Sequence, residues 1–154
     1  MTYLITFACY GCHLHGDESG SVDREHNLPG CRLVAGDLKR VSTERGNMDQ
    51  SPYSMDGKRR EAVLGSLLDH CSHRNWSVLA AHVRSTPCSH CGRKRGSAGA
   101  DHERRIGLDE PARKRWARHG STRWLLKAEN VSAAVRYVVD KQGEPMSVFE
   151  ASVS

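Results

Sequence analysis

Apolar residues gather in two short runs that are typical of strands. The first extends from Tyr3 to Tyr10 and stops at Gly11, and the second extends from Trp76 to Arg84. Both contain several β-branched or aromatic residues and are too short for core helices. The pattern predicts a buried first strand and a second strand in the middle of the chain. A further short strand is expected at Thr122–Leu126.

Two segments show the spacing of amphipathic helices instead. In each, apolar residues recur every three or four positions and form one stripe. The stripes consist of Val63, Leu64, Leu67, Leu68 and Cys71 within 58–71, and of Val131, Ala134, Val135, Val138 and Val139 after a cap at Asn130. A short basic helix is expected at 110–118, and residues 16–52 read as a long loop with a short helical piece. This order of elements predicts an α+β sandwich, with the helices on one face of an antiparallel sheet.

The pattern breaks between Ser85 and Arg105. This stretch is rich in Gly, Ser and basic residues and has no apolar periodicity. Three segments are therefore expected: a domain over 1–146, an aberrant and disordered insert over 86–105 within it, and a C-terminal tail over 147–154.

Charge is unevenly placed along the 154 residues. Residues 86–127 hold eleven Lys and Arg against four Asp and Glu, within a chain of net charge +5. A basic segment on a near-neutral body is typical of nucleic-acid binders, although a solvated basic face is the plainer interpretation. No apolar run reaches membrane-spanning length, so no membrane is expected as a partner. Six cysteines without an export signal indicate a reducing compartment, the cytoplasm.

Several short motifs carry a family resemblance. They are Tyr3–Phe7, Tyr10–Gly11, Leu14–Glu18, Gly20–Arg24, Trp76–Arg84, Arg115–Arg123 and Ala134–Val138. Together they resemble REP-associated tyrosine transposases, chromosomal relatives of the single-strand HUH transposases. The resemblance covers most of the chain outside the break.

The resemblance implies a bacterial, nucleoid-associated protein with a ferredoxin-like sheet, often dimeric, that cleaves and rejoins single-stranded or hairpin DNA. In the family, two histidines flanking one apolar residue hold Mg²⁺ or Mn²⁺ on a central strand. The metal polarises the scissile phosphate, and a tyrosine on a late helix forms the phosphotyrosine intermediate. Tyr137 matches that nucleophile. An ordinary amphipathic tyrosine at a helix–sheet edge is the alternative.

The histidine pair of the family is missing after Arg84. One inserted base converts a coding stretch for Ser-Asn-His-Val-His into one for Ser85–Ser89 as it stands. Our hypothesis is that residues 86–105 are frameshifted. The central strand of the sheet is then expected to be missing or distorted, and the chain to be catalytically impaired. His90 and Gln142 are then the remaining metal-ligand candidates. Gln142 lies one residue beyond the position at which some relatives carry a third ligand, where this chain has Lys141.

A basic, Trp-containing run is the candidate DNA-binding segment. It comprises Arg113, Lys114, Arg115, Trp116, Arg118 and His119, with Arg123 beyond. Cations with indoles suit phosphate contacts and base stacking on single strands. A solvated helix with Trp116 packed inward is the alternative.

Other interpretations come from different classes of protein. One is a noncatalytic DNA-binding remnant that uses this run. Another is a small zinc module, because Cys88 and Cys91 form one CxxC and Cys9 and Cys12 form a second. His13 and His15 also flank one apolar residue, but their place after the first strand favours coincidence.

Overall fold

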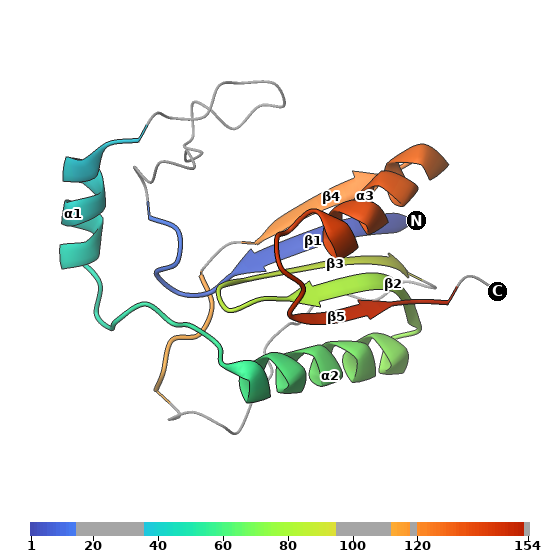
Figure 1. The fold of residues 1–154 in the computed structure, drawn as a ribbon, viewed down its shortest axis with the longest axis horizontal. Helices are drawn as coiled ribbons and strands as arrows, with labels where there is room; N and C mark the ends of the chain where they lie inside the picture. The colour runs from blue at the N-terminus through green and yellow to red at the C-terminus, as the bar shows by residue number, and fades with distance from the viewer. Residues whose placement is uncertain (15–35, 95–111, 118–119, 153–154) are drawn as a thin grey trace.

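The chain folds around one antiparallel sheet. The computed structural model describes residues 1–14, 36–94, 112–117 and 120–152, with the backbone alone at 87, 88 and 94. The elements within these ranges, in chain order, are β1 (Thr2–Ala8), α1 (Leu38–Gly46), α2 (Gly57–His73), β2 (Trp76–Val83), β3 (Pro87–Lys94), β4 (Ser121–Leu125), α3 (Ala128–Asp140) and β5 (Ser147–Glu150). The strand order is β4-β1-β3-β2-β5 (Figure 1). The α+β class with an antiparallel sheet is confirmed, and the arrangement is consistent with a ferredoxin-like fold.

The break in the sequence supplies the central strand of this sheet. β3 pairs with β1 from Ala8↔Pro87 to Thr2↔Arg93, and on its other side with β2. The expectation that the sheet lacks its central strand is therefore wrong for residues 87–94. The backbone N–H and C=O groups of β1 and β2 need partners, and any segment that can adopt an extended backbone between them can supply these. Pro87 stands at the first position of β3, where a strand tolerates proline. The expected distortion is limited to a register shift between Val78 and Ala80.

Helices cover both faces of the sheet, whereas one covered face was expected. On one face, α2 packs Val63, Leu67 and Cys71 into a cluster with Ala81 and Val83. On the other, α3 packs Ala134 against Cys91 and Leu125. Ala80 and Ala81 are both fully buried. Because consecutive residues of a strand point to opposite faces, this burial requires that both faces of the sheet are covered. We call these faces the α2 face and the α3 face.

Several expected boundaries also move. The part of 110–118 that the structure describes is extended rather than helical: Trp116 bridges to Cys9, and Ala117 N–H donates to the Ala8 carbonyl at 2.9 Å. The basic run thus prolongs the sheet beside the end of β1. α3 begins before Asn130, with Lys127 at its N-cap and no capping side chain. Residues 147–150, expected in a tail, form the edge strand β5 on β2.

Candidate nucleic-acid interface

Tyr137 lies on the exposed side of α3. Its side chain is 45% exposed, whereas Val138, the next residue, is completely buried. The phenol makes no hydrogen bond within the described part of the chain. The position is open to solvent and to a ligand.

The two metal-ligand candidates do not converge. His90 pairs with Ile5 and Ala81, lies on the α2 face and meets the Phe7 ring edge-on at 6.1 Å. Gln142 follows α3, which covers the opposite face. Within the described residues, no three His, Cys, Asp or Glu side chains lie close enough to hold a metal. The residues that the structure describes therefore do not form the Mg²⁺ or Mn²⁺ site that the resemblance implies.

The cysteines do not fit the rival zinc site either. Cys9 belongs to the cluster beneath α2 and Cys91 to the cluster beneath α3, so the sheet separates their thiols. Burial, together with the nearby Cys12, raises the pKa of Cys9 to about 12, and burial raises the pKa of Cys91 to about 11.

Two cations of the basic run are held by the segment before α2. Arg113 Nη2 donates to the carbonyls of Ser51 at 2.8 Å and Pro52 at 3.1 Å, and its guanidinium lies 5.4 Å from the centre of the Tyr53 ring. Lys114 pairs with Asp49 and lies 5.6 Å from the Tyr10 ring. Both side chains therefore fix 112–117 against 49–53, which leaves less of their charge for a phosphate.

The indole of the basic run also packs inward. Trp116 meets the Phe7 ring edge-on, with ring centres 5.0 Å apart, at the rim of the core beneath α2. Arg115 uses its carbonyl to accept from Tyr10 N–H at 2.9 Å. Arg118 and His119 lie outside the described residues, as does His15, which with His13 flanks one apolar residue.

An aromatic row crosses the α2 face near the start of β1. Tyr3 contacts Trp76 with ring centres 5.6 Å apart and Trp124 at 6.4 Å. Tyr3 stands directly opposite Gly92 of the intervening β3, so no side chain separates its ring from that of Trp76. We call Tyr3, Trp76 and Trp124 the aromatic row. Trp124, on the edge strand β4, is 62% exposed and follows the exposed Arg123.

Sequence reasoning missed this row although a signal was present. The expected strand at 122–126 alternates faces, which separates Trp124 from Arg123 and aligns it with neighbouring aromatics. What the sequence could not show was that Tyr3 and Trp124 are paired residues of adjacent strands.

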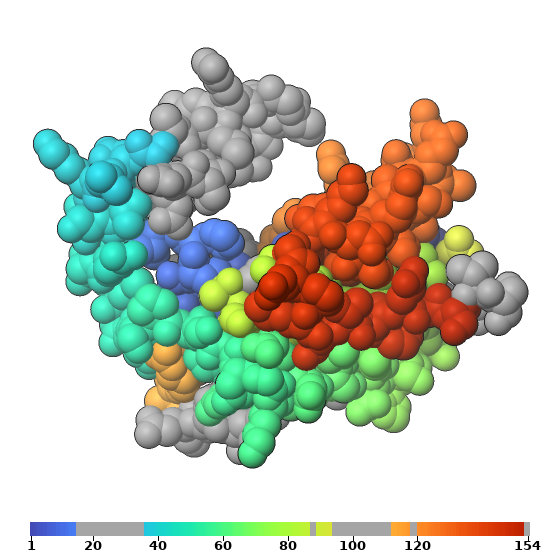
Figure 2. All heavy atoms as spheres, viewed as in Figure 1, coloured from blue at the N-terminus to red at the C-terminus, as the bar shows by residue number. Residues whose placement is uncertain are grey.

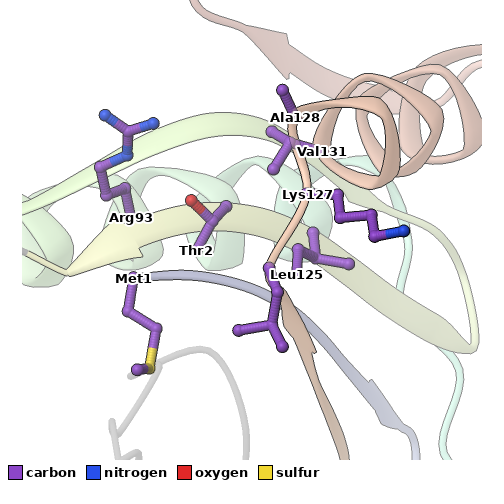
Figure 3. A pocket seen from close by; sticks show the side chains of 8 residues that line it. Met1, Thr2, Arg93, Leu125, Lys127, Ala128 and Val131 are labelled. Atoms are coloured by element: carbon purple, nitrogen blue, oxygen red, sulfur yellow. The ribbon is translucent and has the colours of Figure 1, made fainter.

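A hollow at the N-terminus of α3 adds two cations near the same end of the sheet. It is lined by Met1, Thr2, Arg93, Leu125, Leu126, Lys127, Ala128 and Val131. Arg93 and Lys127 lie on either side of it (Figure 3). Its floor is apolar and open, so we assign it no ligand of its own.

His82 joins three elements from the α3 face. Its ring is fully buried, and Met146 N–H donates to Nε2 at 3.2 Å. The accepting Nε2 requires the proton on Nδ1, which donates to the Val138 carbonyl at 3.1 Å. Burial lowers the pKa of His82, the nearby Arg84 lowers it further, and the bond to Val138 opposes both. Both ring nitrogens are thus used to hold α3 and the turn before β5 on β2.

Comparisons of the chain with protein-family models, with curated proteins and with solved structures gave no match. Among the described residues, no helix is both long and apolar enough to cross a membrane. The case for a function therefore rests on the residues described above and on the resemblance of the short motifs.

Proposed function

We propose that this chain binds single-stranded or hairpin DNA as a catalytically impaired relative of the REP-associated tyrosine transposases. The observation that carries the proposal is the aromatic row with its exposed end at Trp124. Unpaired bases stack on aromatic side chains presented by a sheet, as in many single-strand binders. The overall charge of +5 favours a phosphate backbone beside it, and the exposed Arg123 lies on the other face of the same edge strand.

The face that α3 covers supports catalytic impairment. A metal that serves Tyr137 would have to be held there, and β3 offers Ser89 and Cys91 on that face while His90 points to the other. The imidazole that does face α3 belongs to His82, whose two nitrogens are already hydrogen bonded. Ser89 occupies one of the two positions to which the frameshift hypothesis assigns the lost histidines.

Two finer parts of the proposal follow from the same family resemblance. The first is a homodimer. The edge strands β4 and β5 each have one side without a partner strand in this sheet, and their backbone groups there can pair with a second copy of the chain. Association with the nucleoid is the other, as a consequence of binding DNA.

Oligonucleotide binding tests the main proposal. A fluorescein-labelled thymidine decamer should bind at low salt, and Trp124→Ala should raise its Kd about tenfold, since one base stack contributes about 1–3 kcal/mol. Trp116→Phe is the matched control, because Trp116 packs against Phe7 inside the sheet rim. Equal affinity of the native protein and Trp124→Ala would show that the aromatic row is not part of the interface. An absence of binding at low salt would refute the proposed DNA-binding function.

Cleavage of a labelled DNA hairpin in the presence of Mg²⁺ or Mn²⁺ tests the impairment. We expect no product and no covalent protein–DNA adduct, either from the native chain or from Tyr137→Phe. The reason is that no three His, Cys, Asp or Glu side chains among the described residues lie close enough to hold the metal. An adduct that the native chain forms and Tyr137→Phe does not would show that the chain is an active enzyme.

A further inference from the structure

Arg84 is a partly buried cation that has no counter-charge among the described residues. It follows directly after β2, and its Nε is buried without a hydrogen-bond partner. Among the described residues it forms no ion pair, although Asp140 and Glu144 lie exposed at the end of α3 and in the turn beyond it. Burying an unpaired charge is costly, so buried arginines are usually paired. The buried Nε of Arg84 therefore lacks an acceptor in the described part of the chain.

A second unpartnered donor lies in the turn that packs against Arg84. Gln142 is only 8% exposed, and its Nε2 is buried without a hydrogen-bond partner. The next residue, Gly143, has φ +87°, and a Cβ built on it would lie 3.2 Å from Arg84 Nη2. The backbone of this turn thus lies directly against the guanidinium. Figure 2 shows the red segment after α3 at the molecular surface, above the green α2.

We propose that Arg84 and Gln142 bind a phosphate group at this corner, between the end of β2 and the turn after α3. Each side chain has a buried donor without a partner, Arg84 Nε and Gln142 Nε2, and a guanidinium can only donate, so the missing ligand is an acceptor. The positive charge of Arg84 favours an anion over water and excludes a metal cation. Oxyanions of the phosphate class match the fork of N–H groups on arginine.

A second guanidinium raises the positive potential nearby. Arg60, from α2, donates through Nη1 to the Met55 carbonyl at 2.9 Å and to Ser85 Oγ at 3.4 Å. Ser85 is the residue after Arg84, so the two cations flank the same end of β2. The pKa of His82, on the same strand, is lowered mainly by burial and further by the charge of Arg84.

The phosphate could come from two sources that share this chemistry, the free anion and the phosphodiester of a nucleic acid. Only the second rests on the proposed function. A free-phosphate site would stand even if the chain bound no DNA.

Thermal unfolding in sodium phosphate, compared with sodium chloride at equal ionic strength, tests the site. We expect phosphate to raise the Tm of the native protein. Arg84→Met should weaken the apparent affinity for phosphate at least tenfold, because a charge-assisted hydrogen bond is lost. Arg136→Met, at an exposed arginine of α3, is the matched control and should respond as the native protein does. Equal responses in Arg84→Met and Arg136→Met would overturn the proposal.

A second variant keeps the test valid if Arg84→Met does not fold. Gln142→Glu adds a carboxylate at the residue before Gly143, whose backbone lies against the guanidinium, and should occupy the site internally. We expect a higher Tm in chloride and no further rise in phosphate. A phosphate response as large as that of the native protein would contradict the site.

The thymidine decamer separates the two sources. If the site takes a phosphodiester, Arg84→Met should reduce the slope of log Kd against log salt by about one. If the slope is unchanged while the phosphate response is lost, the site binds the free anion only. Binding of the decamer without any effect of Arg84 on either measurement would leave the proposed function standing and refute this site.

Discussion

Replacing His82 with alanine is expected to lower the free energy of unfolding by about 3 kcal/mol or more. Removing a buried ring leaves a cavity that costs about 2–5 kcal/mol in comparable core truncations. The Met146 N–H and the Val138 carbonyl also lose their partner, and a buried polar group without a partner costs about 1–3 kcal/mol. Because α3 and β5 depend on this ring, both should loosen together.

Urea denaturation followed by circular dichroism measures this change. His73→Ala is the matched control, because His73 is exposed at the end of α2 and should change the unfolding free energy by less than about 0.5 kcal/mol. His82→Gln retains a donor and an acceptor and should fall between the two. If His82→Ala unfolds within about 0.5 kcal/mol of the native protein, the ring does not hold α3.

The same ring makes stability depend on pH. The pKa of His82 is lowered from 6.5 in the folded state, so in the window below 6.5 the unfolded chain binds a proton that the folded chain does not. Stability should therefore fall as the pH falls below about 6.5, and protonated Nε2 could no longer accept from Met146. The fall should be steeper for the native protein than for His82→Gln in urea titrations at pH 7.5 and 5.5.

The strongly periodic parts of the fold were predictable. The apolar stripes located α2 and α3 within a few residues, and the two apolar runs located β1 and β2. The central strand was not predictable, because its sequence lacks the apolar or alternating pattern of a strand. β3 is extended because β1 and β2 both pair with it, a tertiary effect that overrides local propensity.

The candidate site was only partly predictable for the same reason. The sequence showed that Arg113, Lys114 and Trp116 are cationic or aromatic, but their partners come from 49–53 and from the core. That segment has no periodicity and so gave no indication of contact. Conversely, Arg84 and Gln142 are 58 positions apart in the numbering, and the fold packs the turn at Gly143 against Arg84. Tyr137 stays a prediction as a nucleophile, because its exposed position neither requires nor excludes that role.

Replacing Gly92 with valine is expected to lower the free energy of unfolding by about 2 kcal/mol, within the range for an overpacked core. Valine normally favours strands, so local propensity alone predicts a gain. At Gly92, however, a Cβ would lie 3.2 Å from the Ser77 carbonyl oxygen, which belongs to the paired backbone of β2. The two further methyl groups would stand on the α2 face, where Tyr3 and Trp76 now meet across β3.

Urea denaturation and the affinity for the thymidine decamer should both respond to this change, since separating Tyr3 from Trp76 breaks the aromatic row. Gly65→Val is the matched control, because nothing lies within 4 Å of a Cβ at Gly65, on the exposed side of α2. That variant should be as stable as the native protein or slightly more stable, since valine is the better helix former. Loss of DNA affinity in Gly92→Val, with no loss in Gly65→Val, would show that the interface depends on the contact between Tyr3 and Trp76 across Gly92. Unchanged stability and affinity in Gly92→Val would show instead that the two rings tolerate a side chain between them and that the row is not a single surface.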